Sequence, residues 1–156
     1  MDNEKTIDAL NSLIVINNDR IEGYKTAEAE AKETDLKMLF SDLMQTSVQN
    51  RKELVTEVTR LGGTPDEGTR ITGKFFRVWM DVKAAFTGDD RKAILDSCEY
   101  GETVALDLYK KILIEGHQNT DDNQQDMLNR HHALISADYA KIVQLRDAVA
   151  AAKTDY

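Results

Sequence analysis

Apolar side chains recur in steps of three and four along four long segments of this chain, and this periodicity constrains the fold more than any other feature. Such spacing places the apolar side chains on one face of an α-helix. The only proline among the 156 residues is Pro65, and there are eight glycines, so long stretches lack helix-breaking residues. A chain of this length suits one domain with one core. We therefore expect a single all-α domain that spans residues 1–156.

The four segments predict four long helices arranged as two antiparallel hairpins. The first helix covers about residues 6–32, and the second is capped by Thr34 or Asp35 and ends at Gly62-Gly63. Glycine readily adopts the left-handed conformation that closes a helix. The third helix starts near Asp90 and stops at Gly116, and the fourth follows the polar turn at residues 119–123. Short links within each pair favour hairpins.

A long connection, residues 62–90, joins the two hairpins and carries a helix of its own. Thr64, Pro65 and Glu67 have the spacing of a capping box with proline at the first helical position, which predicts a helix start. An apolar stripe then runs from Phe75 to Phe86. A helix of about 25 residues measures roughly 38 Å, and this connection is long enough to cross that length. One long crossover between hairpins is the ferritin-like connectivity; the alternative is a shorter crossover that caps one end of an up-down bundle.

Three sequence segments resemble a known family. They are residues 76–88 of the crossover, residues 98–102 of the third helix and residues 22–24 of the first, and the glycine pair at 62–63 also fits. Together they resemble a bacterial ferritin-like four-helix-bundle family that is labelled a domain of unknown function. The resemblance covers nearly all of the chain and implies the fold. The family has no agreed activity, and the resemblance implies only an association with bacterial stress responses.

A ferritin-like bundle raises the question of a metal site. Dinuclear iron or manganese sites need a Glu-x-x-His motif on two helices and a glutamate on each of the other two. None of the three histidines follows a glutamate at that spacing, because the positions hold Ile114, Leu128 and Asn129. A reduced set could hold one iron or manganese ion weakly, and its candidate ligands are Glu22, Glu99, Glu102 and His131.

We favour structural interpretations of these residues over ligation. Glu22 and Glu102 flank the apolar stripes, where carboxylates are usually solvated, and His131 is expected to be a hydrogen-bonded core histidine. Asn17 and Asn50 lie at similar distances from the first hairpin turn, so we expect them to bond to each other and fix the register of the helices. The only cysteine, Cys98, is expected to be a small buried hydrophobe.

Two glycines, Gly23 and Gly101, lie in the middle of long helices, where glycine costs roughly 0.5–1 kcal/mol relative to alanine. We expect at least one of them to allow close helix packing or to leave room for a bulky neighbour, with Tyr24 and Tyr100 as candidates. The glutamates beside them would then lie near one another, where a pocket should be sought.

The aromatic helix from Phe75 to Phe86 allows two interpretations. It either packs on the bundle or binds a membrane surface or a partner protein. We favour packing, with Trp79 largely buried, because a crossover must bury apolar surface to stay ordered.

Charge and composition bear on partners and function. The net charge of −8 and the pI near 4.9 argue against nucleic acid. There is no apolar stretch of about 18 residues and no signal peptide, so we expect a cytoplasmic, acidic protein with no membrane span. We favour a non-catalytic bundle without a cofactor that acts by binding a protein partner or by self-association as a homodimer. The alternatives are a metal-binding, ferroxidase-like carboxylate protein with iron or manganese, and a protein that binds a small ligand between its helix pairs.

Overall fold

The computed structural model describes residues 3–68, 74–88 and 90–154, with the backbone alone for residues 74–78, 150, 153 and 154. The described residues form helices and no strand, which confirms the predicted all-α class. None of the helices in these ranges has both the length and the apolar character needed to cross a membrane. The elements are α1 (Asn3–Glu30), α2 (Thr34–Arg60), α3 (Lys74–Thr87), α4 (Arg91–Glu115), the short 3-10 turn η1 (His117–Asn119) and α5 (Asp122–Thr154).

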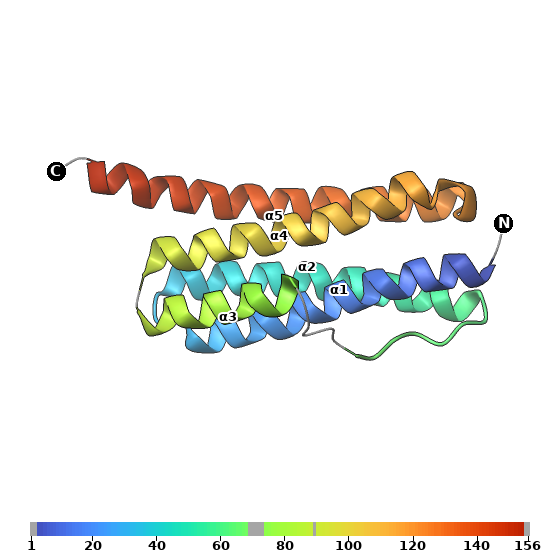
Figure 1. The fold of residues 1–156 in the computed structure, drawn as a ribbon, viewed down its shortest axis with the longest axis horizontal. Helices are drawn as coiled ribbons and strands as arrows, with labels where there is room; N and C mark the ends of the chain where they lie inside the picture. The colour runs from blue at the N-terminus through green and yellow to red at the C-terminus, as the bar shows by residue number, and fades with distance from the viewer. Residues whose placement is uncertain (1–2, 69–73, 89, 155–156) are drawn as a thin grey trace.

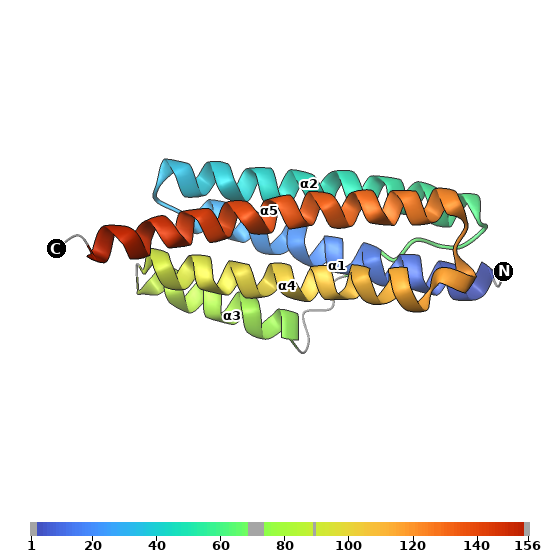
Figure 2. The same ribbon diagram turned by 90° about the horizontal axis from the view of Figure 1, so that it is seen from above.

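The four long helices lie side by side along one axis (Figures 1 and 2). Helices α1 and α2 form one hairpin, and α4 and α5 form the other. After the far end of α2, residues 63–68 return along α1, and α3 lies beside the hairpins (Figure 1). Helix α3 packs mainly against α4 and also contacts α1. The crossover thus leaves α3 on the outside of the two hairpins.

Backbone geometry explains where the helices end. Gly62 has a positive φ of 83°, and its N–H donates to Thr59 O at 3.0 Å while that of Gly63 donates to Val58 O at 3.0 Å. This is the glycine-terminated helix end that the sequence predicts. Helix α2 begins without a side-chain cap at Glu33, so the predicted caps Thr34 and Asp35 are wrong: both residues already lie in the first turn.

The predicted helix start at Thr64 is also wrong, because residues 63–68 are not helical. Two asparagines of α1 hold this segment instead. Asn11 Nδ2 donates to Thr64 O at 3.1 Å, and Asn18 Nδ2 donates to Gly68 O at 2.9 Å. An extended chain covers about 3.3 Å per residue against 1.5 Å in a helix. A non-helical start therefore lets fewer residues run back along the bundle. The predicted end near Thr87 is confirmed.

The core consists of two apolar clusters with polar side chains between them. One cluster includes Leu10, Leu54 and Leu128, and the other includes Phe40 and Leu95. On each long helix a buried polar residue lies in sequence between the two clusters; these residues are Arg20 on α1, Ser47 on α2, Glu102 on α4 and Asp138 on α5. The middle of the bundle is therefore polar, and it holds the buried groups with the most potential for site chemistry.

Candidate functional site

The four candidate metal ligands lie in different surroundings. Glu22 is exposed on α1. Glu99 is half-buried on α4, where it accepts hydrogen bonds from Tyr139 and Arg146 of α5. Glu102 and His131 are fully buried, but each bonds to different partners. Within the described ranges, no three His, Cys, Asp or Glu side chains are grouped so that they could hold a metal ion.

Glu102 belongs to a buried ion cluster to which all four long helices contribute. Arg20 Nη2 lies 3.0 Å from both carboxylate oxygens of Glu102 and 3.3 Å from Asp138 Oδ2. Arg20 Nη1 donates to Ser47 Oγ, and Tyr24 Oη donates to Glu102. Arg20 is 1% exposed and Glu102 is 0% exposed, so the expectation that Glu102 is a solvated flanking residue is wrong.

Burial and charge act in opposite directions in this cluster. Burial disfavours the charge on Arg20, but Glu102, Tyr24 and Asp138 outweigh it and raise the pKa of the guanidinium. Burial raises the pKa of Glu102, although the bonds from Arg20 and Tyr24 oppose it. Burial likewise raises the pKa of Asp138 against the attraction of Arg20. One guanidinium thus serves two carboxylates, and removal of Arg20 would leave both without their main partner.

A second polar chain leads from the surface into the bundle. Asn17 Nδ2 donates to Tyr109 Oη at 2.9 Å, and Tyr109 Oη lies 3.0 Å from His131 Nδ1. His131 Nε2 lies 2.6 Å from Glu53 Oε2. Because an ionised carboxylate only accepts, His131 carries its hydrogen on Nε2 and accepts from Tyr109 at Nδ1. Glu53 also accepts from Arg130, at 2.8 Å. The predicted core histidine is therefore confirmed.

Burial and hydrogen bonding also set the ionisation of this chain. Burial lowers the pKa of His131, and the hydrogen bond to Glu53 only partly compensates. Partial burial tends to raise the pKa of Glu53, but the bonds from His131 and Arg130 outweigh it and lower the pKa. Burial raises the pKa of Tyr109, although Asn17 opposes this. The geometry favours a neutral imidazole between a neutral phenol and an ionised carboxylate.

Two further core predictions can be compared with the structure. Asn17 Nδ2 bonds to Leu13 O and Tyr109 Oη, and neither Asn17 Oδ1 nor Asn50 Nδ2 has a hydrogen-bond partner. The expected hydrogen bond between Asn17 and Asn50 is therefore wrong. Cys98 is buried as expected, and burial, followed by the charge of Glu102, raises the pKa of its thiol.

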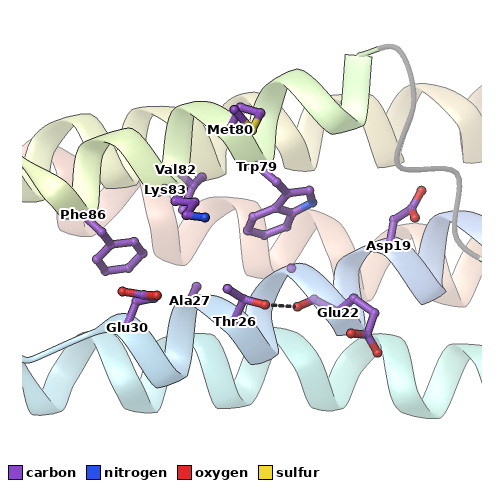
Figure 3. A pocket seen from close by; sticks show the side chains of 11 residues that line it. Asp19, Glu22, Thr26, Ala27, Glu30, Trp79, Met80, Val82, Lys83 and Phe86 are labelled. Atoms are coloured by element: carbon purple, nitrogen blue, oxygen red, sulfur yellow. Dashed lines mark hydrogen bonds between the residues drawn. The ribbon is translucent and has the colours of Figure 1, made fainter.

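An open groove lies between α1 and α3 (Figure 3). Its cavity volume is about 270 Å³. Its walls are mostly apolar and come from Gly23, Ala27, Trp79, Val82 and Phe86. Charged side chains line the same groove; these are Asp19, Glu22 and Glu30 of α1 and Lys83 of α3. Apolar walls with a few polar groups are typical of small-ligand sites.

Gly23 makes room for Trp79 in this groove. A Cβ atom on Gly23 would overlap the Trp79 indole ring. Trp79 is half-buried and packs edge-to-face against Tyr24, with ring centroids 5.2 Å apart. The expected room for a bulky neighbour is confirmed at Gly23, but the neighbour comes from α3. The candidate tyrosines lie elsewhere: Tyr24 is buried in the core and Tyr100 is 50% exposed.

Arg20 is a site residue that was not predicted from the sequence, although its position carries a signal. Asn17, Arg20 and Tyr24 follow steps of three and four, so they share one helix face. The neighbouring Ile21, although apolar, is only half-buried. No local signal identifies the partners of Arg20, because Glu102 is 82 positions away.

Comparison with known proteins gives a family but no activity. No curated protein matches the chain. A family model described as a domain of unknown function, DUF2383, matches residues 5–115. That match extends from α1 to the end of α4 and covers well over half of the chain. The chain therefore belongs to the DUF2383 family, a family defined by a domain of unknown function.

Proposed function

We propose that this protein is a non-catalytic, ferritin-like bundle of the bacterial cytoplasm that binds a small apolar ligand in the groove between α1 and α3. The observation that carries the proposal is the open, mostly apolar groove of about 270 Å³. Two hairpins joined by a long crossover support the ferritin-like affiliation. Here the crossover helix α3 supplies one wall of the groove, which gives that helix a role beyond connecting the hairpins. Self-association as a homodimer and a role in stress responses stay predictions.

The bonding of the interior side chains supports a non-catalytic role. Ser47 Oγ is bound to Arg20, His131 is bonded at both ring nitrogens, and burial keeps Cys98 in its thiol form. A nucleophile needs an adjacent base or a lowered pKa together with access to the substrate. None of these three side chains has that combination.

The alternative of a carboxylate metal site fits these residues poorly. Glu102 and Asp138 are two interior carboxylates that both accept hydrogen bonds from Arg20. The guanidinium already supplies their positive charge, so a metal ion would have to displace it. We therefore propose no resident iron or manganese. Two equivalents of either metal in protein purified without chelators would overturn this part of the proposal, as would saturable iron oxidation.

The groove can be tested with the protein's own fluorescence. Trp79 is the only tryptophan in the chain and lines the groove, so ligand entry should change its emission. We expect octan-1-ol, a neutral apolar probe, to produce a saturable change. Thr26 also lines the groove, and Thr26→Phe should weaken the response.

Thr56→Phe provides a matched control for that variant. Thr26 and Thr56 are both exposed, and each hydroxyl donates to a backbone carbonyl four residues earlier, at 3.0 Å. Thr56, however, lies on α2, away from the groove. The control variant should bind like the wild type. A non-saturable response, or an equal response in both variants, would contradict binding in the groove.

A further inference from the structure

We infer that the ligand of the α1–α3 groove is an amphiphile with an apolar body and a positively charged group, such as an alkyl amine or a quaternary ammonium compound. This inference rests on the proposed function and narrows it. It follows from the arrangement of the charged and aromatic side chains around the groove.

Carboxylates lie along the whole α1 side of the groove. Asp19, Glu22 and Glu30 line it, and with Thr26 they follow steps of three and four, so they occupy one face of the helix. Asp19 is buried, whereas Glu22 and Glu30 are exposed. The span from residue 22 to residue 30 is about 12 Å at 1.5 Å per residue. A ligand lying along the groove would meet an exposed carboxylate at either end of this span.

The described part of the opposite wall supplies a positive charge and two aromatic rings. Among the lining residues whose side chains the structure describes, Lys83 is the single cation, and it faces the exposed carboxylates of Glu22 and Glu30 across the groove. Trp79 and Phe86 are seven residues apart and reach the groove from the same side of α3 (Figure 3). Aromatic faces attract cations and pack well against alkyl chains.

The charge of the surroundings favours a cation over an anion. The chain as a whole carries −8, and among the described groove residues the two exposed carboxylates of Glu22 and Glu30 stand against the one ammonium of Lys83. An anionic amphiphile would be repelled by these two carboxylates and attracted by that ammonium. A cationic amphiphile gains apolar contact along the walls and attraction at the ends, and both parts match the groove.

The experiment compares three probes of equal chain length by calorimetry on the full chain: octylammonium, octan-1-ol and octanoate. We expect octylammonium to bind roughly 3- to 10-fold more tightly than octan-1-ol, which is the range of a partly screened ion pair with an aromatic contact. Octanoate should bind most weakly. Because exposed charges are screened by salt, the preference should shrink in about 1 M salt.

A pair of double variants locates the preference. Glu22→Gln with Glu30→Gln removes two groove carboxylates while keeping side-chain size, so octylammonium should bind no more tightly than octan-1-ol. Asp42→Asn with Asp107→Asn changes the net charge equally, at exposed positions of α2 and α4 outside the groove. This control should keep the preference.

The possible results separate the inference from the proposed function. If all three probes bind equally, or octanoate binds most tightly, the inference is wrong while the groove remains a ligand site. A preference that survives in the groove double variant also overturns the inference. If no probe binds, the proposed function fails together with the inference.

Discussion

The interior of the bundle and the α1–α3 groove differ in an unexpected direction: the interior is polar in its middle, and the groove on the surface is mostly apolar. In the interior, Arg20 donates to Glu102 at 3.0 Å and to Asp138 at 3.3 Å. In the groove, Trp79 and Phe86 remain partly open to solvent. Polar side chains inside and apolar side chains outside reverse the usual distribution.

This difference bears on where the protein can act. The charged groups of the interior cluster are bonded to one another through Arg20, so a ligand entering there would have to break strong, buried bonds. The groove loses nothing comparable when it is covered, because its walls are mostly apolar and Glu22, Glu30 and Lys83 are exposed to solvent. Burial of apolar surface is worth roughly 25 cal/mol per Å². Ligand binding in the α1–α3 groove is therefore favoured over ligand binding between the four long helices.

The largest expected effect tests the closed interior. Arg20→Met keeps an apolar chain of similar length but leaves Glu102 and Asp138 buried without their cation. Breaking a buried ion pair from one side typically costs about 3–5 kcal/mol, and we expect a loss of this size in a urea melt. Arg146→Met removes a partly exposed partner of Glu99 and should cost no more than about 1 kcal/mol. Equal losses would show that burial does not distinguish the two arginines.

The second prediction tests the groove wall. Trp79 packs against both core clusters, so Trp79→Ala should cost about 3 kcal/mol in the same melt, at the low end for a large aromatic because the ring is half-buried. Met80→Ala alters a neighbour that is 52% exposed and should change stability by less than about 0.5 kcal/mol. If Trp79→Ala leaves stability unchanged but abolishes binding, then α3 serves ligand or partner binding and does not stabilise the bundle.

The third prediction concerns the fit of Trp79 on Gly23. Gly23→Ala should destabilise by about 1–2 kcal/mol, because the clash with the indole exceeds the gain in helix propensity. The same change with Trp79→Leu should recover part of the loss, and a double-mutant cycle measures that coupling. Gly88→Ala meets only ordinary contacts and should be close to neutral. Stabilisation by Gly23→Ala would mean that the ring is not held where the structure places it. The corresponding change at Gly101, which is buried in α4, stays a prediction.

The smallest effect tests the second polar chain by pH. Burial lowers the pKa of His131, so the unfolded chain takes up this proton at a higher pH than the folded chain. Stability is therefore fully present above the unfolded value of about 6.5, and it is lost as the pH falls through the folded pKa. His131→Asn should therefore flatten the curve of unfolding free energy against pH below about pH 6.5. An unchanged slope in His131→Asn would contradict the assignment.

The periodicity of the sequence predicted the helices well because it is a local signal. The all-α class, the helix end at Gly62 and the core position of His131 all follow from spacing within one segment. The helix start predicted from the capping box at Thr64 is wrong although the residues fit the pattern, because Asn11 and Asn18 of α1 donate hydrogen bonds to the backbone there. Tertiary hydrogen bonds thus outweighed a local preference.

The candidate site depends on contacts between residues that lie far apart in the sequence, and no local pattern reveals such contacts. Gly23 signalled a close approach, but nothing near it in the sequence pointed to Trp79, 56 positions away. The burial of Arg20 could not be predicted for the same reason, since a charged residue on a helix is normally assigned to the surface. Its burial becomes reasonable only when Glu102 and Asp138 are known to face it.

The most direct test of the account is a nuclear magnetic resonance titration of the labelled protein with octan-1-ol. The signals of the Trp79 indole N–H and of the Gly23 and Ala27 amides should shift in a saturable way, while the side-chain signals of Tyr109 and His131 stay in place. That result would place the ligand in the groove and leave the interior closed. Shifts at Tyr109 and His131 without shifts at Trp79 would contradict the account, because the ligand would then enter between the four long helices.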